Sequence, residues 1–437
     1  MLKKIDKATA TGIMNALRAG TVPSDGLEHF AVGLDQQMNI LREQREWVSS
    51  GRSAFKFVRG GYGSGKTFLT SLAAAEATES NFLVSKVVIS ATDTPLYRLS
   101  SVYRRLCQNL SLTDRKGGSL QTLVDRWLYR LEDQVIEIDG IEEDDEAFAD
   151  AVAKKVETNL IRVGERAGRL AVCLKAYHKA KFHNKFSDAR GLLDWMSGDN
   201  KVGFDVKKLA DVTGRVENWD VVPFLRGWLE LMEASGYSGL FLVLDEVETV
   251  LRLRRPERLK SLEVLRQLID AIENNELPGL HLVMTGTPDF FEGSQGVPSL
   301  QPLHERIRVT GHQDEPSNLR QPQIELPTLD RERLFSAAKK IRALYPSPHP
   351  EALETKVPDA FISALVDSMT AGFGGQVEVV PRLFLREFVH ILDLVDQHSD
   401  YDPLRSYVFE KDRLETEFMN SAERAAIVEE ETVPILI

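Results

Sequence analysis

The sequence predicts an α/β protein whose parallel sheet carries a phosphate-binding loop. A short β-type run at 54–58 leads into Gly60-Gly61-Tyr62-Gly63-Ser64-Gly65-Lys66-Thr67, and a helical run follows at 68–77. Further apolar, strand-like runs lie at 86–91, 240–244, 280–285 and 323–326. Continuous apolar strands separated by helices are typical of a parallel sheet covered on both faces.

The glycine-rich octet matches the pattern GxxxxGK[ST], in which backbone N–H groups surround a polyphosphate. The strand before it and the helix after it are the setting that this chemistry requires. We expect Lys66 to reach the β- and γ-phosphates, and the Thr67 hydroxyl to take one position on Mg²⁺. The alternative is a glycine-rich turn with an unrelated lysine.

Composition limits the class of protein. The 437 residues leave room for two or three domains with a large core. No apolar run approaches the roughly 18 residues of a membrane span, and the N-terminus lacks the apolar stretch of a signal peptide. Cys107 and Cys173 show no metal-type spacing, which favours a reducing cytoplasm. The net charge of −12 argues against a uniformly basic surface but allows a local basic channel.

Four segments are expected along the chain. They are a helical lead-in at 1–50, a nucleotide-binding domain at 51–328, a helical lid at 329–400 and a tail at 401–437. In the lead-in, helical periodicity covers 8–18 and 36–48. Between about 110 and 220 the pattern becomes strongly helical, and the sheet resumes afterwards. We therefore expect a helical insertion within the nucleotide-binding domain.

The insertion contains an acidic run at 139–146 and then a basic run. The basic residues are Lys175, His178, Lys179, Lys181, His183 and Lys185. Most charge runs are solvated faces, and the acidic one is interpreted so. For the basic run two interpretations stay open, which are a solvated helix face and a nucleic-acid contact through Lys179 and Lys181.

Hydrolysis is indicated by Asp245-Glu246 at the end of an apolar strand. Asp245 would hold Mg²⁺ directly or through water, and Glu246 would polarise the attacking water. Glu248 lies too far along to be the base. The alternative is a pair of acidic residues that favour a helix N-terminus.

The next apolar strand ends in Thr285-Gly286-Thr287. A polar side chain there can lie between the γ-phosphate and the attacking water and so sense the bound nucleotide. Thr285 is the better candidate and Thr287 the second. An ordinary turn at the end of a strand would have the same sequence pattern.

Two arginines have positions that suit catalysis. Arg306 lies after the sensing strand, where it could reach a neighbouring subunit's γ-phosphate. Arg382 opens a helix of the lid and could contact phosphate from above. Either one alone could be a plain surface charge.

A basic segment follows the acidic strand end. Residues 249–260 hold five positive charges, Arg252, Arg254 and Arg255 among them, against one carboxylate. In a ring, this segment would face the central opening and bind phosphate backbones without base readout. An exposed, salt-bridged helix is the other interpretation.

Together these motifs resemble an AAA+ ATPase of the initiator-like branch. The segment 15–23, Gly26-Leu27 with Val32-Gly33, and the motifs GGYGSGKT, LDEVE and TGTPDFF resemble the BREX-type ATP-binding family, in its BrxD-like branch. The resemblance implies a parallel five-stranded sheet of order 5-1-4-3-2, ATP at 60–67 and adenine near Val32 and Gly33. It also implies a trans-acting Arg306 and a lid Arg382.

Two departures from the family pattern affect these expectations. Leu34-Asp35 follows Gly33 where many relatives have Arg-Glu, so the adenine contacts are open. The residues after the lid are too few for a winged-helix domain. Any DNA contact must then come from the ring or the insertion.

The leading hypothesis is a cytoplasmic ATPase of a phage-defence system. It would form a homo-oligomeric ring of six or seven subunits and act on double-stranded DNA with a helicase partner. A second hypothesis is a nucleotide-gated scaffold that recruits a helicase or nuclease, with hydrolysis only resetting it. A small-molecule kinase is disfavoured by Asp245-Glu246 and by Arg382. An ABC-type ATPase is disfavoured because no LSGGQ-like signature occurs.

Overall fold

The computed structural model describes residues 5–112, 115–116, 119–310, 318–326, 329–372 and 381–407. The chain forms two compact units. One is drawn from Met1–Asn39, Val58–Ala75 and Ile324–Ile437, and the other from Ile40–Phe57 and Glu76–Gln323. The predicted tail from residue 408 onward and the glycine-rich turn from 373 lie outside the described residues. The predicted domain boundaries stay a prediction.

A single mixed sheet runs in the order β4-β3-β2-β5-β6-β1-β7. Its strands are β1 (Ala54–Arg59), β2 (Phe82–Val88), β3 (Ser111–Leu112), β4 (Arg115–Lys116), β5 (Gly239–Asp245), β6 (Leu280–Gly286) and β7 (Gln323–Glu325). The prediction of five parallel strands is wrong for the sheet as a whole, because β3 and β4 add an antiparallel edge beside β2. The five predicted strands keep the order 5-1-4-3-2 within this larger sheet.

The centre of the sheet is apolar on both faces. Every residue of β5 and of β6 is buried. The two strands pair in parallel from Leu240 opposite Leu280 to Leu244 opposite Met284. This register decides which side chains meet at the strand ends, because a slip of one residue would turn each side chain to the other face.

The second predicted strand, at 86–91, is wrong in its bounds, since β2 runs from Phe82 to Val88. Ser90 ends it. The Ser90 hydroxyl accepts hydrogen bonds from the N–H groups of Asp93 and Thr94, and Thr94 Oγ1 donates to Val88 O over 2.6 Å. Local side-chain bonds of this kind replace the strand ladder with a turn.

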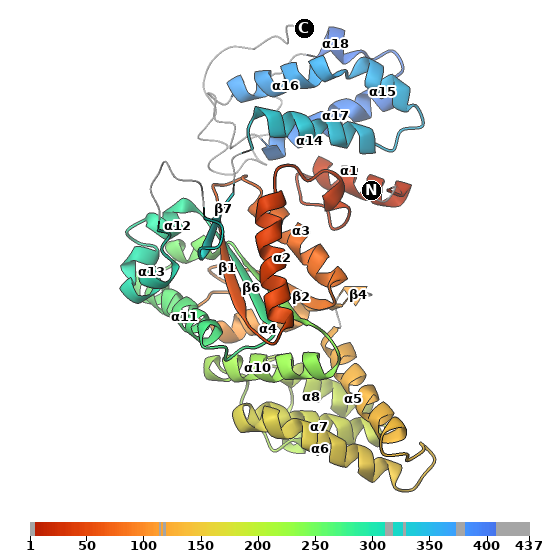
Figure 1. The fold of residues 1–437 in the computed structure, drawn as a ribbon, viewed down its shortest axis with the longest axis vertical. Coiled ribbons are helices and arrows are strands. Elements are labelled where there is room, and N and C mark those ends of the chain that lie inside the picture. The colour runs from red at the N-terminus through yellow and green to blue at the C-terminus, as the bar shows by residue number, and fades with distance from the viewer. Residues whose placement is uncertain are drawn as a thin grey trace. The chain divides into compact units, whose positions relative to one another are not determined.

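Helices cover the second unit and form the insertion. They are most of α2 (Asp35–Ser49), α4 (Leu99–Asn109), α5 (Ser119–Glu137), α6 (Phe148–Arg166), α7 (Gly168–Phe182), α8 (Phe186–Met196), α9 (Phe204–Leu209), α10 (Asn218–Ala234), α11 (Arg255–Glu273), α12 (Pro288–Glu292) and α13 (Gln301–Ile307). α10 packs on β5 and on α5, α6 and α7, so it joins the insertion to the sheet (Figure 1). Short 3-10 turns lie at Val247–Arg252 and Val297–Ser299.

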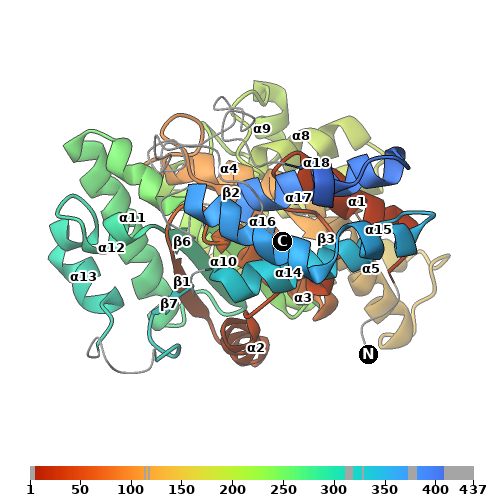
Figure 2. The same cartoon turned by 90° about the horizontal axis from the view of Figure 1, so that it is seen from above.

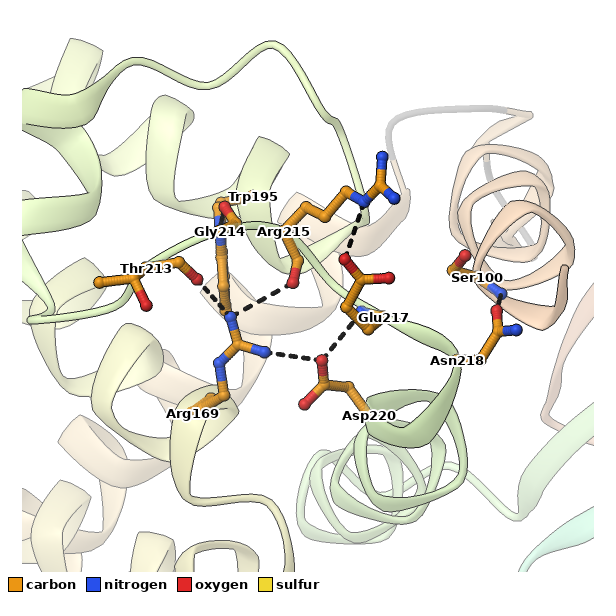
Figure 3. A network of polar contacts seen from close by, with 9 residues as sticks. All are labelled: Ser100, Arg169, Trp195, Thr213, Gly214, Arg215, Glu217, Asn218 and Asp220. Carbon is orange, nitrogen blue, oxygen red and sulfur yellow. Dashed lines mark hydrogen bonds and ion pairs between the residues drawn. The ribbon is translucent and has the colours of Figure 1, made fainter.

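One arginine fixes the segment that returns from the insertion to α10 (Figure 3). Arg169 donates to Thr213 O over 2.6 Å, to Arg215 O over 3.2 Å and to the Asp220 carboxylate over 2.6 Å. Its guanidinium carbon lies 4.9 Å from the centroid of the Trp195 ring. Asp220 also accepts the Glu217 N–H and so caps α10. The start of α10 therefore depends on a side chain from α7.

The first unit contains the lead-in helix α1 (Lys7–Arg18), a 3-10 turn at Leu27–His29, most of α3 (Lys66–Glu79) and the helices of the predicted lid. The lid helices are α14 (Arg331–Leu344), α15 (Pro350–Lys356), α16 (Asp359–Gly372), α17 (Pro381–Gln397) and α18 (Pro403–Ser406). Figure 2 shows α14 to α17 grouped together, with α1 against α17. Among the residues that the structure describes, no helix has both the length and the apolar character needed to cross a bilayer.

Replacing Arg169 should destabilise the second unit. Arg169→Ala leaves the Asp220 carboxylate, which is 7% exposed, without its cationic partner. Because Arg169 is itself about one-third exposed, we expect a loss of about 2 kcal/mol rather than the larger cost of a fully buried pair. Thermal unfolding followed by circular dichroism measures this loss.

Arg190→Ala is the matched control. It removes an exposed (i, i+4) pair with Asp194 from α8, a pair of the kind that contributes under about 0.5 kcal/mol. Equal melting temperatures for the two variants would show that the Arg169 network does not stabilise the fold.

Candidate functional site

The octet forms a tight loop between β1 and α3 in the first unit. Gly63 and Gly65 have φ angles of 79° and 90°, which favour glycine. A Cβ on Gly60 would lie 2.3 Å from Ser64 Oγ, so a side chain at this position would require the Ser64 side chain to move. Lys66 Nζ donates to Gly60 O and to Gly61 O over 2.7 Å each. The lysine ammonium is therefore held inside the loop.

The end of the loop has the features of an anion site. Lys66 is 8% exposed, and its Nζ lies 5.6 Å from the centroid of the Tyr62 ring. Thr67 is the second residue of α3 and is half-buried. The dipole at a helix N-terminus favours a phosphate beside these residues.

The residues predicted near adenine lie on the same unit as the loop. The Phe30 ring packs edge-on against Phe68 of α3 at 5.2 Å between centroids, which fixes this part of the lead-in on the helix that follows the loop. Gly33 has a φ of 68°, and a Cβ there would lie 2.7 Å from Arg333 Nε. Val32 beside it is half-buried. Arg333 of α14 therefore lies beside Gly33, which is itself exposed.

Arg333 was not predicted. It lies in the first turn of α14, where the Asp330 side chain accepts the Arg333 N–H over 2.9 Å. A helix start is visible in the sequence, but nothing in it links this arginine to a glycine 300 residues away. Arg382, the predicted lid arginine, is half-buried as the second residue of α17, and its Cγ and Cδ lie 3.6 Å from where a Cβ on Gly20 would be.

In the second unit, one threonine joins both acidic residues. Thr285 is fully buried, and its Oγ1 donates to Asp245 Oδ1 over 2.5 Å. The same oxygen accepts the Glu246 N–H over 2.9 Å. The parallel register of β5 and β6 causes this meeting, because Asp245 and Thr285 each come one residue after the last pair, Leu244 and Met284. The structure thus brings these three predicted residues together.

Glu246 has an uncommon backbone conformation. Its φ of 61° lies in the left-handed region, which costs a residue with a side chain about 1 kcal/mol or more. The bond from the Glu246 N–H to Thr285 holds this conformation. The Glu246 side chain is exposed, whereas Glu248 is 6% exposed. The geometry favours Glu246 over Glu248 as the group that meets water.

Asp245 also has a cationic partner that was not predicted. Lys86 of β2 places its Nζ 3.1 Å from Asp245 Oδ2. Asp245 is 3% exposed, so its charge needs such compensation. A hard cation with oxygen ligands suits the same carboxylate, and Thr67 and Asp245 have the donor types that Mg²⁺ takes. Lys86 was missed because only the pairing of β2 with β5 brings it to this strand end.

Thr287 has a different environment from Thr285. It is 5% exposed and precedes α12, and its hydroxyl does not cap that helix. The acidic pair is bonded to Thr285 alone of the two threonines. The geometry therefore favours Thr285 over the second candidate.

Arg306 is engaged within its own chain. Its Nε donates to Asp270 of α11, and its Nη1 donates to Pro302 O over 2.7 Å. Asp270 also accepts a hydrogen bond from Arg266. The Arg306 side chain is 31% exposed. An arginine that reaches a neighbouring subunit from here must first leave Asp270.

The two predicted basic surfaces differ. Arg252, Arg254 and Arg255 are exposed, and among the described residues none of them makes an ion pair, so the salt-bridged alternative does not describe them. In the insertion, Lys181 pairs with Asp125 at 3.2 Å, whereas Lys179 is exposed. The basic run is thus partly neutralised.

Thr285→Val tests the central contact. The substitution keeps the shape but leaves the Asp245 carboxylate without one donor and the Glu246 N–H without its acceptor. We expect a loss of about 2–3 kcal/mol, seen as a fall in melting temperature of about 2–5 °C.

Thr287→Val is the control for the same chemical change two residues later. Its melting temperature should stay near that of the unsubstituted protein, because its hydroxyl is not bonded to the acidic pair. If the two valine variants have the same melting temperature, Thr285 does not organise this strand end.

A family model described as "BREX system ATP-binding protein BrxC/D" matches residues 5–411. The match includes the loop, the acidic strand end, the insertion and the lid helices. No curated protein matches the chain.

Proposed function

The chain belongs to the BREX system ATP-binding protein family BrxC/D, and from this premise we propose that it binds and hydrolyses ATP in a bacterial phage-defence system. The loop at 60–67 would hold the phosphates, with Lys66 on the β- and γ-phosphates. Val32, Gly33 and Arg333 would face the adenine side. Cytoplasmic location is part of the proposal.

The residues at the strand ends would each have a different role in hydrolysis. Thr67 and Asp245 would hold Mg²⁺, whose charge offsets that of the phosphates. Glu246 would accept a proton from water as that water attacks the γ-phosphorus. Thr285 positions Asp245 and Glu246 relative to each other, and Arg382 would contact phosphate from the lid.

One observation supports hydrolysis above the others. Glu246 is exposed and its backbone has a left-handed conformation. The same Thr285 hydroxyl that binds Asp245 holds this backbone. Strained backbone that is held by its surroundings is typical of functional sites. A purely structural pair of acids would need neither the strain nor the exposed carboxylate.

A nucleotide-gated scaffold is the second candidate. Two contacts favour it, because Lys86 neutralises Asp245 and Asp270 holds Arg306. Both contacts engage residues that hydrolysis would need elsewhere. In such a protein ATP binding would be the signal, and hydrolysis would only reset it.

Glu246→Gln and Lys66→Ala separate binding from hydrolysis. Glu246→Gln should bind ATP normally and hydrolyse it at least about 100-fold more slowly, since it lacks the general base. Lys66→Ala should weaken ATP binding at least about tenfold, because it loses a charged contact to phosphate. Titration with a fluorescent ATP analogue and phosphate release measure the two effects.

The phage-defence readout then decides between the two candidates. Loss of defence in Glu246→Gln supports an ATPase that must turn over, and defence locked on supports the gated scaffold. In both candidate functions Glu246 is the general base. Hydrolysis that continues unchanged in Glu246→Gln would contradict that role.

We further propose that the protein assembles into a ring of six or seven subunits on double-stranded DNA and works with a helicase. The exposed Arg252, Arg254 and Arg255 support a contact with phosphate backbones. Arg306 would leave Asp270 and stabilise charge at the neighbour's γ-phosphate, an effect of about 10³-fold or more in arginine-finger systems.

Mixing two inactive variants tests whether Arg306 acts between subunits. Arg306→Ala keeps the acidic pair, and Glu246→Gln keeps the arginine, so a mixed interface contains every part. We expect each variant alone to be slow and the mixture to regain ATP hydrolysis.

Arg308→Ala, an exposed arginine two residues later, should behave like the unsubstituted protein in the same assay. If mixing restores nothing while both variants still assemble and bind ATP, Arg306 does not act across the interface.

A further inference from the structure

Two phenylalanines stand exposed where α7 meets α8. Phe182 is 56% exposed and Phe186 is 60% exposed. Between them, Asn184 takes a left-handed φ of 54°, and the Lys185 N–H donates to Ala180 O over 2.8 Å. The turn is therefore fixed by its own backbone. We name residues 179–186 the α7–α8 corner.

These two rings take no part in packing α7 against α8. The buried residues of the two helices are Leu170, Cys173, Leu174, Tyr177, Ala180, Ala189, Leu192, Leu193, Trp195 and Met196. That set already covers the facing sides of both helices. Large apolar side chains exposed without a packing role indicate a binding surface.

The chain segment that contains the corner is basic, although Asp188 follows it directly. Residues 175–187 contain four lysines and two histidines but no aspartate or glutamate, in a chain of net charge −12. Lys175 pairs with Glu157, and Lys181 pairs with Asp125. Lys179 and Lys185 are exposed and make no ion pair among the described residues.

Cations and rings alternate within the corner. Lys181 Nζ lies 5.8 Å from the centroid of the Phe186 ring. The His183 ring meets the Phe182 ring edge-on, with 5.3 Å between centroids. Aromatic faces between positive charges are the combination that binds unpaired nucleotides, because bases stack on rings and phosphates meet cations.

We propose that the α7–α8 corner binds single-stranded nucleic acid. Phe182 and Phe186 stack on bases, and Lys179 and Lys185 contact phosphates. A duplex keeps its base faces inside the stack, so the exposed rings favour unpaired strands. The inference rests on the proposed function only in taking nucleic acid as the anionic partner, and it does not depend on ATP.

Fluorescence anisotropy of the full chain without nucleotide tests this proposal. The probes are labelled deoxythymidine and uridine oligomers of about 20 nucleotides, longer than a typical single-strand site, and a duplex of the same length. Phe182→Ala and Phe186→Ala should each weaken oligomer binding at least about fivefold, the lower end for loss of one base stack. Comparison of the two oligomers tells DNA from RNA.

Two further variants separate stacking from general surface effects. Phe186→Trp should bind the oligomer at least as well as the unsubstituted protein, because it keeps a stacking face. Ile161→Ala removes another exposed apolar side chain, 60% exposed on α6 of the same insertion, and should leave binding unchanged. All four variants should keep the melting temperature of the unsubstituted protein.

Three results would overturn the proposal. One is unchanged oligomer binding in the Phe182→Ala, Phe186→Ala double variant, and another is an equal loss of duplex binding. The third is no oligomer binding at low salt, together with self-association that the double variant abolishes, which would make the corner a protein contact. Lys66→Ala separates the two proposals. If it loses ATP binding and keeps oligomer binding, the result bears on the ATP site and agrees with a separate oligomer site at the corner.

Discussion

The hydroxyl of Thr285 is the contact on which the acidic strand end depends. It donates to Asp245 and accepts from the backbone of Glu246, so one buried atom sets both residues. Neither bond forms without the parallel register of β5 and β6. The relative placement of Asp245, Glu246 and Thr285 is thus set by the sheet.

The insertion adds a second kind of surface to this core. α10 packs on β5 and on three insertion helices, and Arg169 secures its first turn. Asp245 and Thr285 are buried and hydrogen-bonded to each other, whereas the α7–α8 corner is exposed, basic and aromatic. The residues proposed for hydrolysis and the corner proposed to bind unpaired strands therefore both lie on the second unit.

Local patterns made much of the fold and site predictable. The octet, the strand ending in Asp245-Glu246 and the helices of the lead-in and lid each need only a few neighbouring residues to be recognised. The edge formed by β3 and β4 was not predicted, because two-residue strands leave almost no periodicity. The start of β2 was missed since its apolar residues Phe82 to Val84 follow a helix directly.

Contacts between distant segments could not be predicted from the sequence. Lys86 pairs with Asp245, Arg333 lies beside Gly33 and Arg306 pairs with Asp270, and the partners are dozens to hundreds of residues apart in the sequence. A lysine or an arginine in a strand or helix has no local signal for such a partner. These contacts give Asp245 and Arg306 partners within the chain that local sequence patterns do not reveal.

We propose that this chain has one ATP site whose affinity depends on Mg²⁺. The decisive measurement is a calorimetric titration of the full chain with a non-hydrolysable ATP analogue, with and without Mg²⁺. We expect one nucleotide bound per chain and tighter binding when Mg²⁺ is present. No measurable binding at millimolar analogue with Mg²⁺ would contradict it.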